Sequence, residues 1–184
     1  MKKVILMAAL MLSSVATFAQ NAVGQFSIMP KFGMSIADLT EVDGSDARIG
    51  IVTGAELEYG VTDIFSLSAG ALYSMQGCKG DNSTVKLDYI NIPILANVYV
   101  TKGLAVKLGI QPGFNVNSSF KAKGVEVDDN DAKSVDFSIP VGLSYEINNF
   151  VIDGRYNWGL TKAYEHGDAK NSVFQITLGY KFHL

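Results

Sequence analysis

This 184-residue chain has one cysteine, few basic residues and no long apolar run beyond its first residues. Cys78 is the single cysteine, so no intrachain disulfide can form. The 15 Lys and Arg residues are outnumbered by 18 Asp and Glu residues, and a formal net charge of -3 argues against a nucleic-acid partner. After residue 19 no apolar run approaches the roughly 20 residues that a transmembrane helix needs. These deficits exclude a disulfide-stapled domain, a basic nucleic-acid-binding surface and a helical membrane protein.

The beginning of the chain has the composition of a secretory signal peptide. Lys2 and Lys3 precede an uninterrupted apolar run, and the small residue Ala19 follows. The run is too short to cross a membrane, and we expect cleavage after Ala19. Residues 1–19 are therefore predicted to be a signal peptide and residues 20–184 a single mature domain with a net charge of -5, because Lys2 and Lys3 are removed.

The mature chain alternates between apolar and polar residues, as the final stretch shows. Phe174, Ile176 and Leu178 fall on one side of an extended strand, whereas Gln175 and Thr177 fall on the other. The same period of two predicts eight strands, at residues 26–36, 48–59, 65–75, 87–99, 104–116, 135–145, 150–160 and 172–184. The connections between them alternate between long and short, as in outer-membrane barrels, which pair long extracellular loops with short periplasmic turns.

Two alternations compete in the fourth predicted strand. Ile90 and Ile94 define one apolar face, and Leu87, Tyr89 and Leu95 define the other. A β-bulge would reconcile them, because one extra residue moves the following side chains to the opposite face, and Pro93 is a suitable neighbour for such a break. We favour the arrangement in which the isoleucines face outward.

Alternation alone fits both a soluble β-sandwich and a membrane barrel. Strands of about 11 residues, at roughly 3.3 Å per residue and a tilt near 40°, rise about 28 Å, which matches an apolar band of about 25 Å. The apolar series contain no charge, and aromatic residues such as Tyr59, Tyr99 and Phe150 gather beside the predicted short turns, as interfacial girdles do. We therefore predict an all-β, eight-stranded antiparallel transmembrane up-and-down β-barrel whose apolar face contacts lipid.

A barrel of this kind turns its polar face inward, where five cations and five carboxylates would meet. An isolated charge in that confined space is costly, so the matched numbers predict an internal ion-pair network. Its members are Lys31, Arg48, Glu56, Glu58, Lys107, Asp136, Glu146, Asp153, Arg155 and Lys181. Because eight strands leave little room beyond side chains, we interpret this network as a plug, with a narrow path for small solutes as the alternative.

The sequence contains no recognisable catalytic, cofactor or metal motif. His166 and His183 are the only histidines, and no Gly-x-Ser-x-Gly elbow is present. The acidic stretches at residues 43–46 and 128–131 lack the spacing of a calcium loop. We predict a protein that is not an enzyme and has no cofactor; a lipid-modifying barrel using His166 is a third hypothesis. Cys78 is interpreted as an incidental loop residue.

Four segments carry a resemblance to a known family: residues 17–20 (TFAQ), 87–95 (LDYINIPIL), 109–114 (GIQPGF) and 177–182 (TLGYKF). Together they are similar to the PorT-type family of small outer-membrane β-barrels, related to the OmpA, OmpX and OmpW group. The resemblance implies an outer-membrane location, contact with outer-membrane lipid and lipopolysaccharide, and insertion by the barrel-assembly machinery. The chain departs from the usual terminal aromatic, because His183 and Leu184 follow Phe182. The resemblance implies no activity. Our first hypothesis is a structural or surface-binding barrel whose long connection at 117–134, or whose rim, contacts an envelope or external partner.

Overall fold

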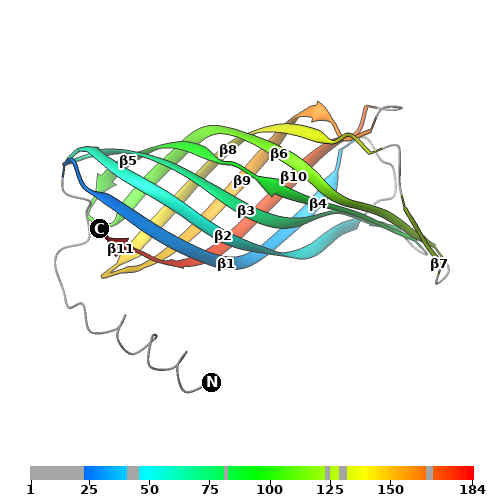
Figure 1. Ribbon diagram of the computed structural model, residues 1–184, viewed down its shortest axis with the longest axis horizontal. Helices are drawn as coiled ribbons and strands as arrows, with labels where there is room; N and C mark the ends of the chain where they lie inside the picture. The colour runs from blue at the N-terminus through cyan, green and yellow to red at the C-terminus, as the bar shows by residue number, and fades with distance from the viewer. Residues whose placement is uncertain (1–22, 41–45, 81–82, 123–124, 129–131, 165–167) are drawn as a thin grey trace, which may run out of the picture.

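The computed structural model describes residues 23–40, 46–80, 83–122, 125–128, 132–164 and 168–184, and nearly all of them lie in antiparallel strands (Figure 1). The strands are β1 (Phe26–Leu39), β2 (Asp46–Thr62), β3 (Phe65–Gly80), β4 (Ser83–Asn91), β5 (Ile94–Thr101), β6 (Leu104–Ala122), β7 (Val125–Asp128), β8 (Val135–Ile147), β9 (Phe150–Lys162), β10 (Lys170–Tyr180) and β11 (Phe182–His183). The predicted cleavage after Ala19 lies outside the described residues.

The strands form a closed ring. Going round the ring, β1 pairs with β2, β2 with β3, β3 with β4 and β5, these two with β6, β6 with β8, β8 with β9 and β9 with β10. The ring closes because β10 pairs with β1 over nine consecutive registers, from Lys31 opposite Gly179 to Leu39 opposite Asn171. β4 and β5 are two parts of one barrel strand, β7 extends from β6, and β11 continues the pairing of β10 with β1. The ring therefore has eight strands, as predicted. No helix in the described ranges has the length and apolar character to cross a membrane, which says nothing about a β-barrel.

The apolar side chains point out of the barrel, and the polar ones point in. On β2, Ile49 and Ile51 are exposed whereas Arg48 is buried, and on β10 Leu178 is exposed whereas Thr177 is buried. The predicted orientation of the alternating faces is confirmed. A wall of this kind must be covered by an apolar medium, because exposing so many large apolar side chains to water is unfavourable.

The fourth barrel strand breaks where the two alternations competed. Ile90 and Ile94 face outward, and Leu87, Tyr89 and Leu95 are buried inside, as we favoured. Residues 92–93 separate β4 from β5, and the register with β6 shifts between Asp88 and Tyr89. The alternation keeps its phase across residues 92–93, because Tyr89 and Leu95 are both buried and Ile90 and Ile94 are both exposed. The register shift lets Asp88 turn inward beside Leu87 and Tyr89.

The strands at the long-loop end run further than the alternation predicted. β3 reaches Gly80 and β4 begins at Ser83, so the predicted 11-residue connection at 76–86 is wrong, and most of it is hairpin. β6 likewise continues to Ala122 and pairs with β7, which replaces part of the predicted loop at 117–134. This sheet of β3, β4, β6 and β7 projects from one end of the barrel (Figure 1). The period of two fades in this region, while the backbone pairing continues.

Cys78 lies within this extension and not in a loop. It is part of β3, pairs with Val85 of β4 and is 5% exposed. Its interpretation as an incidental loop residue is therefore wrong: the side chain packs inside the barrel mouth.

Candidate functional site

The barrel interior brings together five of the ten predicted charged residues in one cluster. Lys31 Nζ lies 2.8 Å from Glu56 Oε2 and 2.9 Å from Asp153 Oδ2. Lys107 Nζ lies 2.8 Å from Asp153 Oδ2, and Arg155 Nη2 lies 2.8 Å from Glu56 Oε1 and 3.0 Å from Asp153 Oδ2. These five side chains, here called the central cluster, come from β1, β2, β6 and β9 and are all buried. Each carboxylate meets more than one cation, which offsets the cost of removing it from water.

Glycines on neighbouring strands make room for the long side chains of the central cluster. Lys31 lies in register between Gly54 and Gly179, so it has no side-chain neighbour directly opposite on either strand. Gly142 likewise lies between Lys107 and Arg155. A Cβ atom on Gly142 would come within 3.0 Å of Arg155 Cβ, and one on Gly179 would come within 3.2 Å of Lys31 Cγ. Glycines opposite inward-facing cations are therefore a second signal in the sequence for this cluster, in addition to the alternation of apolar and polar residues.

A second cluster lies nearer the short turns. Lys181 Nζ is 2.7 Å from Glu146 Oε2 and 3.3 Å from Glu58 Oε2. Tyr99 and Ser66 each donate a hydrogen bond of 2.6 Å to Glu58 Oε1. Tyr99 was predicted to belong to the aromatic girdle, and this is wrong: it lies on the same side of β5 as the buried residues Leu95 and Asn97, so its hydroxyl reaches the interior. We call Glu58, Tyr99, Glu146 and Lys181 the turn-end cluster.

Arg48 has a partner that the alternation pattern missed. Its guanidinium hydrogen-bonds to the backbone oxygen of Gln76 and lies 3.5 Å from Asp88 Oδ1. Asp88 also accepts a hydrogen bond of 3.0 Å from Tyr73. A strict period of two would place Asp88 on the outer face between Leu87 and Tyr89, but it is 4% exposed at the register shift of β4.

Asp136 is the one predicted interior residue that forms none of these ion pairs. It is buried, and its Oδ1 atom accepts a hydrogen bond of 2.7 Å from Thr161. All ten predicted residues thus have buried side chains, and the ion pairs link nine of them, with Asp88 as the additional member.

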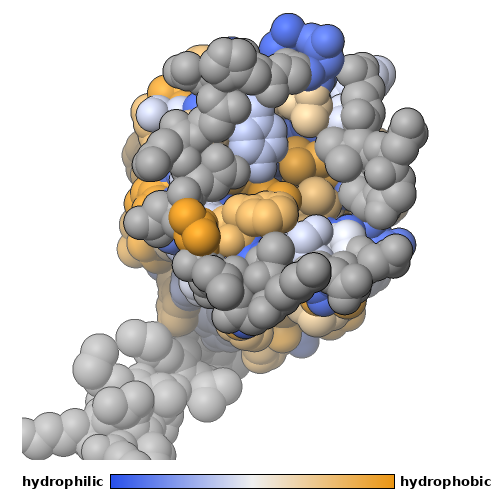
Figure 2. All heavy atoms as spheres, turned by 90° about the vertical axis from the view of Figure 1, so that its right-hand side faces the viewer, coloured by the Kyte–Doolittle hydropathy of each residue, from blue (hydrophilic) through white to orange (hydrophobic). Residues whose placement is uncertain are grey.

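The barrel mouth at the long-loop end has an apolar cluster on its inner face. Leu39, Cys78, Leu87, Tyr89 and Ala163 form a buried cluster on the inner face. We call these five residues the mouth cluster. Figure 2 looks onto this end and shows a hollow whose floor carries both apolar and polar residues. The central and turn-end clusters therefore lie toward the short turns, and the apolar mouth cluster lies at the opposite end, beside the Arg48–Asp88 pair.

An apolar row continues from the mouth cluster onto the projecting sheet. Cys78 is opposite Val85, Val85 is opposite Phe120, and Phe120 is opposite Val127, so the four side chains share one face of β3, β4, β6 and β7. Exposure rises along the row, from 5% at Cys78 to 42% at Phe120 and 59% at Val127. The row therefore begins inside the barrel and ends in an exposed apolar surface.

The remaining sequence candidates do not assemble into a reactive site. His166 lies outside the described residues, as do parts of the two acidic stretches, and His183 is exposed on β11. Within the described ranges no three His, Cys, Asp or Glu side chains are grouped to hold a metal ion. In the last long connection, Asp168 forms an exposed ion pair with Lys162, whose hydrogen bond and charge lower the pKa of the Asp168 carboxyl.

The closed ring, the outward apolar wall and the charged interior define a membrane β-barrel of the small outer-membrane class. Residues 18–165 match the family model of the outer membrane protein beta-barrel domain, which is more than half of the chain. The chain belongs to this family and is an outer-membrane protein. No curated protein sequence matches it.

Solved barrels show the same fold at low sequence identity. The structure of Ail, the attachment invasion locus protein of Yersinia pestis, is 16% identical and has a TM-score of 0.55, covering 87% of this chain and 99% of that one. The same Yersinia protein in complex with the heparin analogue sucrose octasulfate gives 17% identity and a TM-score of 0.53, covering 87% and 99%. Neisserial surface protein A is 13% identical with a TM-score of 0.56, covering 85% and 97%.

Proposed function

We propose that this protein is a non-enzymatic outer-membrane barrel with a plugged interior that binds a partner outside the membrane through its projecting sheet. The observation that carries the proposal is the apolar row from Cys78 to Val127, which leaves the membrane-spanning part of the barrel and ends exposed. The partner class is a protein that presents an apolar segment at the mouth.

The plug follows from the layers inside the barrel. A solute moving along the axis meets the mouth cluster first and then the central and turn-end clusters. Passing the central cluster requires separating Lys31, Lys107 and Arg155 from carboxylates that they contact at about 3 Å. Breaking buried, multiply bonded ion pairs is strongly unfavourable. The interior therefore serves to hold the barrel in shape.

The surface-binding part follows from the exposed end of the row. Phe120 and Val127 are exposed apolar side chains on a sheet that extends past the end of the barrel (Figure 1). We expect water, not lipid, to surround this part of the sheet. Exposed apolar patches with polar surroundings commonly mark interaction sites.

Affinity capture from intact cell envelopes, followed by mass spectrometry, tests the proposal. We expect the wild-type protein to retain a defined partner and the double variant Phe120→Asp, Val127→Asp to lose it. Val23→Asp is the matched control, because Val23 is an equally exposed apolar residue outside the projecting sheet. An unchanged set of captured proteins in the double variant would overturn the proposal.

A narrow passage for small solutes is the second candidate, and one observation favours it. Buried side-chain atoms of Asn91, Gln111 and Asn157 have no protein hydrogen-bond partner, and such groups normally bond to water. Recordings in planar bilayers separate the two functions: a plugged barrel gives no current steps, whereas stable single-channel steps refute the plug.

The lipid-modifying hypothesis has its own test. If the barrel is not an enzyme, His166→Ala should leave the lipid A profile unchanged.

A further inference from the structure

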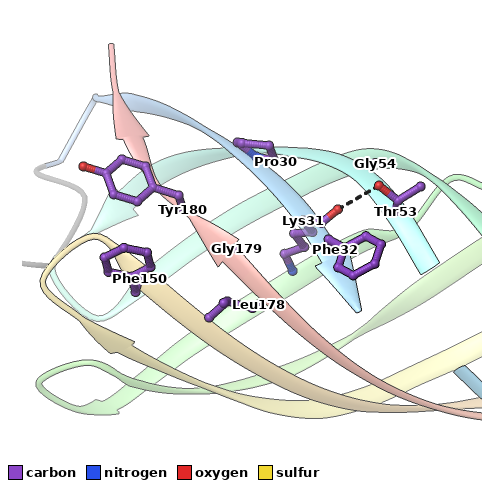
Figure 3. A pocket seen from close by; sticks show the side chains of 9 residues that line it. All are labelled: Pro30, Lys31, Phe32, Thr53, Gly54, Phe150, Leu178, Gly179 and Tyr180. Atoms are coloured by element: carbon purple, nitrogen blue, oxygen red, sulfur yellow. Dashed lines mark hydrogen bonds between the residues drawn. The ribbon is translucent and has the colours of Figure 1, made fainter. Parts of the chain in front are cut away.

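A groove crosses the outer wall of the barrel where β10 closes onto β1. It has a volume of about 370 Å³ and is lined by Pro30, Lys31, Phe32, Thr53, Gly54, Phe150, Leu178, Gly179 and Tyr180. Figure 3 shows the rings of Phe150 and Tyr180 toward one end of these residues and the ring of Phe32 toward the other, with Gly179 between them. The groove therefore lies on the wall that faces lipid, next to the aromatic residues of the short-turn end.

Cross-strand registers explain why the wall is hollow at this place. Gly54, Lys31 and Gly179 lie directly opposite one another on β2, β1 and β10, and each turns its side-chain position inward, so backbone forms the floor. The outward neighbours Pro30 and Thr53 are small. Two pairs of large outward side chains flank these small residues. Phe32 lies opposite Leu178, and Phe150 lies opposite Tyr180, with the centroids of the Phe150 and Tyr180 rings 5.1 Å apart.

The groove presents no free polar group to a ligand along its floor. Thr53 Oγ1 donates a hydrogen bond of 3.2 Å to the backbone oxygen of Lys31, drawn in Figure 3. The ammonium of Lys31 points into the barrel, where it contacts Glu56 and Asp153. A ligand in this groove must therefore be hydrocarbon, since any polar group would lose its water without a partner.

The position of Tyr180 indicates how such a ligand would be oriented. In Figure 3 its hydroxyl points toward the short-turn end, away from Phe32. Short turns of outer-membrane barrels face the periplasm, and tyrosines there lie at the level of the lipid headgroups. A chain that begins beside Tyr180 and runs over Pro30 and Thr53 toward Phe32 thus extends from the interface toward the membrane centre.

We infer that this groove binds one acyl chain of a glycerophospholipid from the periplasmic leaflet of the outer membrane. Nine residues line it, whereas a stable protein interface takes about 20–30 residues on each side, so a second copy of the chain is the poorer occupant. The surrounding membrane supplies such lipid at high local concentration.

Native mass spectrometry tests this inference on protein reconstituted in vesicles of phosphatidylethanolamine and phosphatidylglycerol and then released in mild detergent. We expect the wild-type protein to retain phospholipid and Thr53→Phe, which fills the groove, to lose most of it. Ala69→Phe is the matched control, because Ala69 is also small and exposed on the outer wall but lies outside the groove. Equal retention in the wild type and Thr53→Phe overturns the inference, and so does a dimer that Thr53→Phe dissociates.

A quenching measurement keeps the test decisive if Thr53→Phe does not fold. Trp158 is the only tryptophan and is 64% exposed on the same outer wall. In mixed vesicles containing a phospholipid brominated on its acyl chain, a single tryptophan at the groove (Phe32→Trp with Trp158→Phe) should be quenched more strongly than Trp158 in the wild type. Equal quenching at the two positions would show ordinary boundary lipid and overturn the inference.

Discussion

Lys31 Nζ on β1 lies 2.9 Å from Asp153 Oδ2 on β9, although 122 residues separate them in the sequence. The strand between them in the ring is β10, which contributes the glycine opposite Lys31. The contact therefore spans the closure of the barrel, and it depends on a small residue at the closing seam. Asp153 also contacts Lys107 and Arg155, which makes it the carboxylate on which three cations converge.

Replacing Asp153 by Asn should destabilise the barrel strongly. The change leaves Lys31, Lys107 and Arg155 buried with Glu56 as their remaining carboxylate partner in the central cluster. Removing one partner of a buried ion pair costs about 3–5 kcal/mol of unfolding free energy. Urea titration followed by the heat-modifiable gel mobility of the folded barrel measures the loss. Asp168→Asn is the control and should change stability little, because its ion pair with Lys162 is exposed.

Gly109→Ala should also destabilise the protein, whereas Gly154→Ala should not. A Cβ atom on Gly109 would lie 2.0 Å from the backbone oxygen of Ile94, and the adjacent strand cannot withdraw without losing its pairing. Overpacking of this kind costs about 1–3 kcal/mol. Gly154 has nothing within 4 Å of the same position. Equal urea midpoints for the two variants would contradict the close approach of β5 to β6.

Arginine at an outward position should distinguish the lipid-facing wall from the projecting sheet. Ile110 is 56% exposed on the barrel wall and Val127 is 59% exposed on β7. Arg in place of Ile110 should cost about 2–4 kcal/mol if that residue faces the middle of the bilayer. Arg in place of Val127 should leave the unfolding free energy in vesicles nearly unchanged. A similar change in unfolding free energy at both positions would mean that both side chains lie in lipid or that both lie in water.

Cys78 should react slowly with a maleimide in the folded protein and rapidly in urea. Its side chain is 5% exposed in the mouth cluster, and reaction requires access to the thiolate. Val127→Cys in a Cys78→Ala background is the control and should be labelled many-fold faster in the folded state. Mass spectrometry of timed samples gives both rates. Rapid labelling of folded Cys78 would restore its interpretation as a loop residue.

Local alternation was sufficient to predict most of the barrel. Ile49 and Ile51 beside Arg48, or Leu178 beside Thr177, reveal their faces without any knowledge of neighbouring strands, because a strand turns successive side chains to opposite sides. Where the sequence interrupts this period, the prediction weakened. The orientation of Tyr99 was wrong because two apolar series compete in its strand and it lies on the inward one, and the length of β3 was wrong because backbone bonds carry no side-chain pattern.

The amino-acid sequence by itself therefore determined the eight strands, the outward apolar face and the set of inward charges, because each is a property of residues one or two positions apart. Tertiary structure alone decided which charges meet, as in Arg48 with Asp88, and where the wall is hollow, as between Phe32 and Tyr180. Both depend on the register between strands distant in sequence, and register is set by the closure of the whole ring.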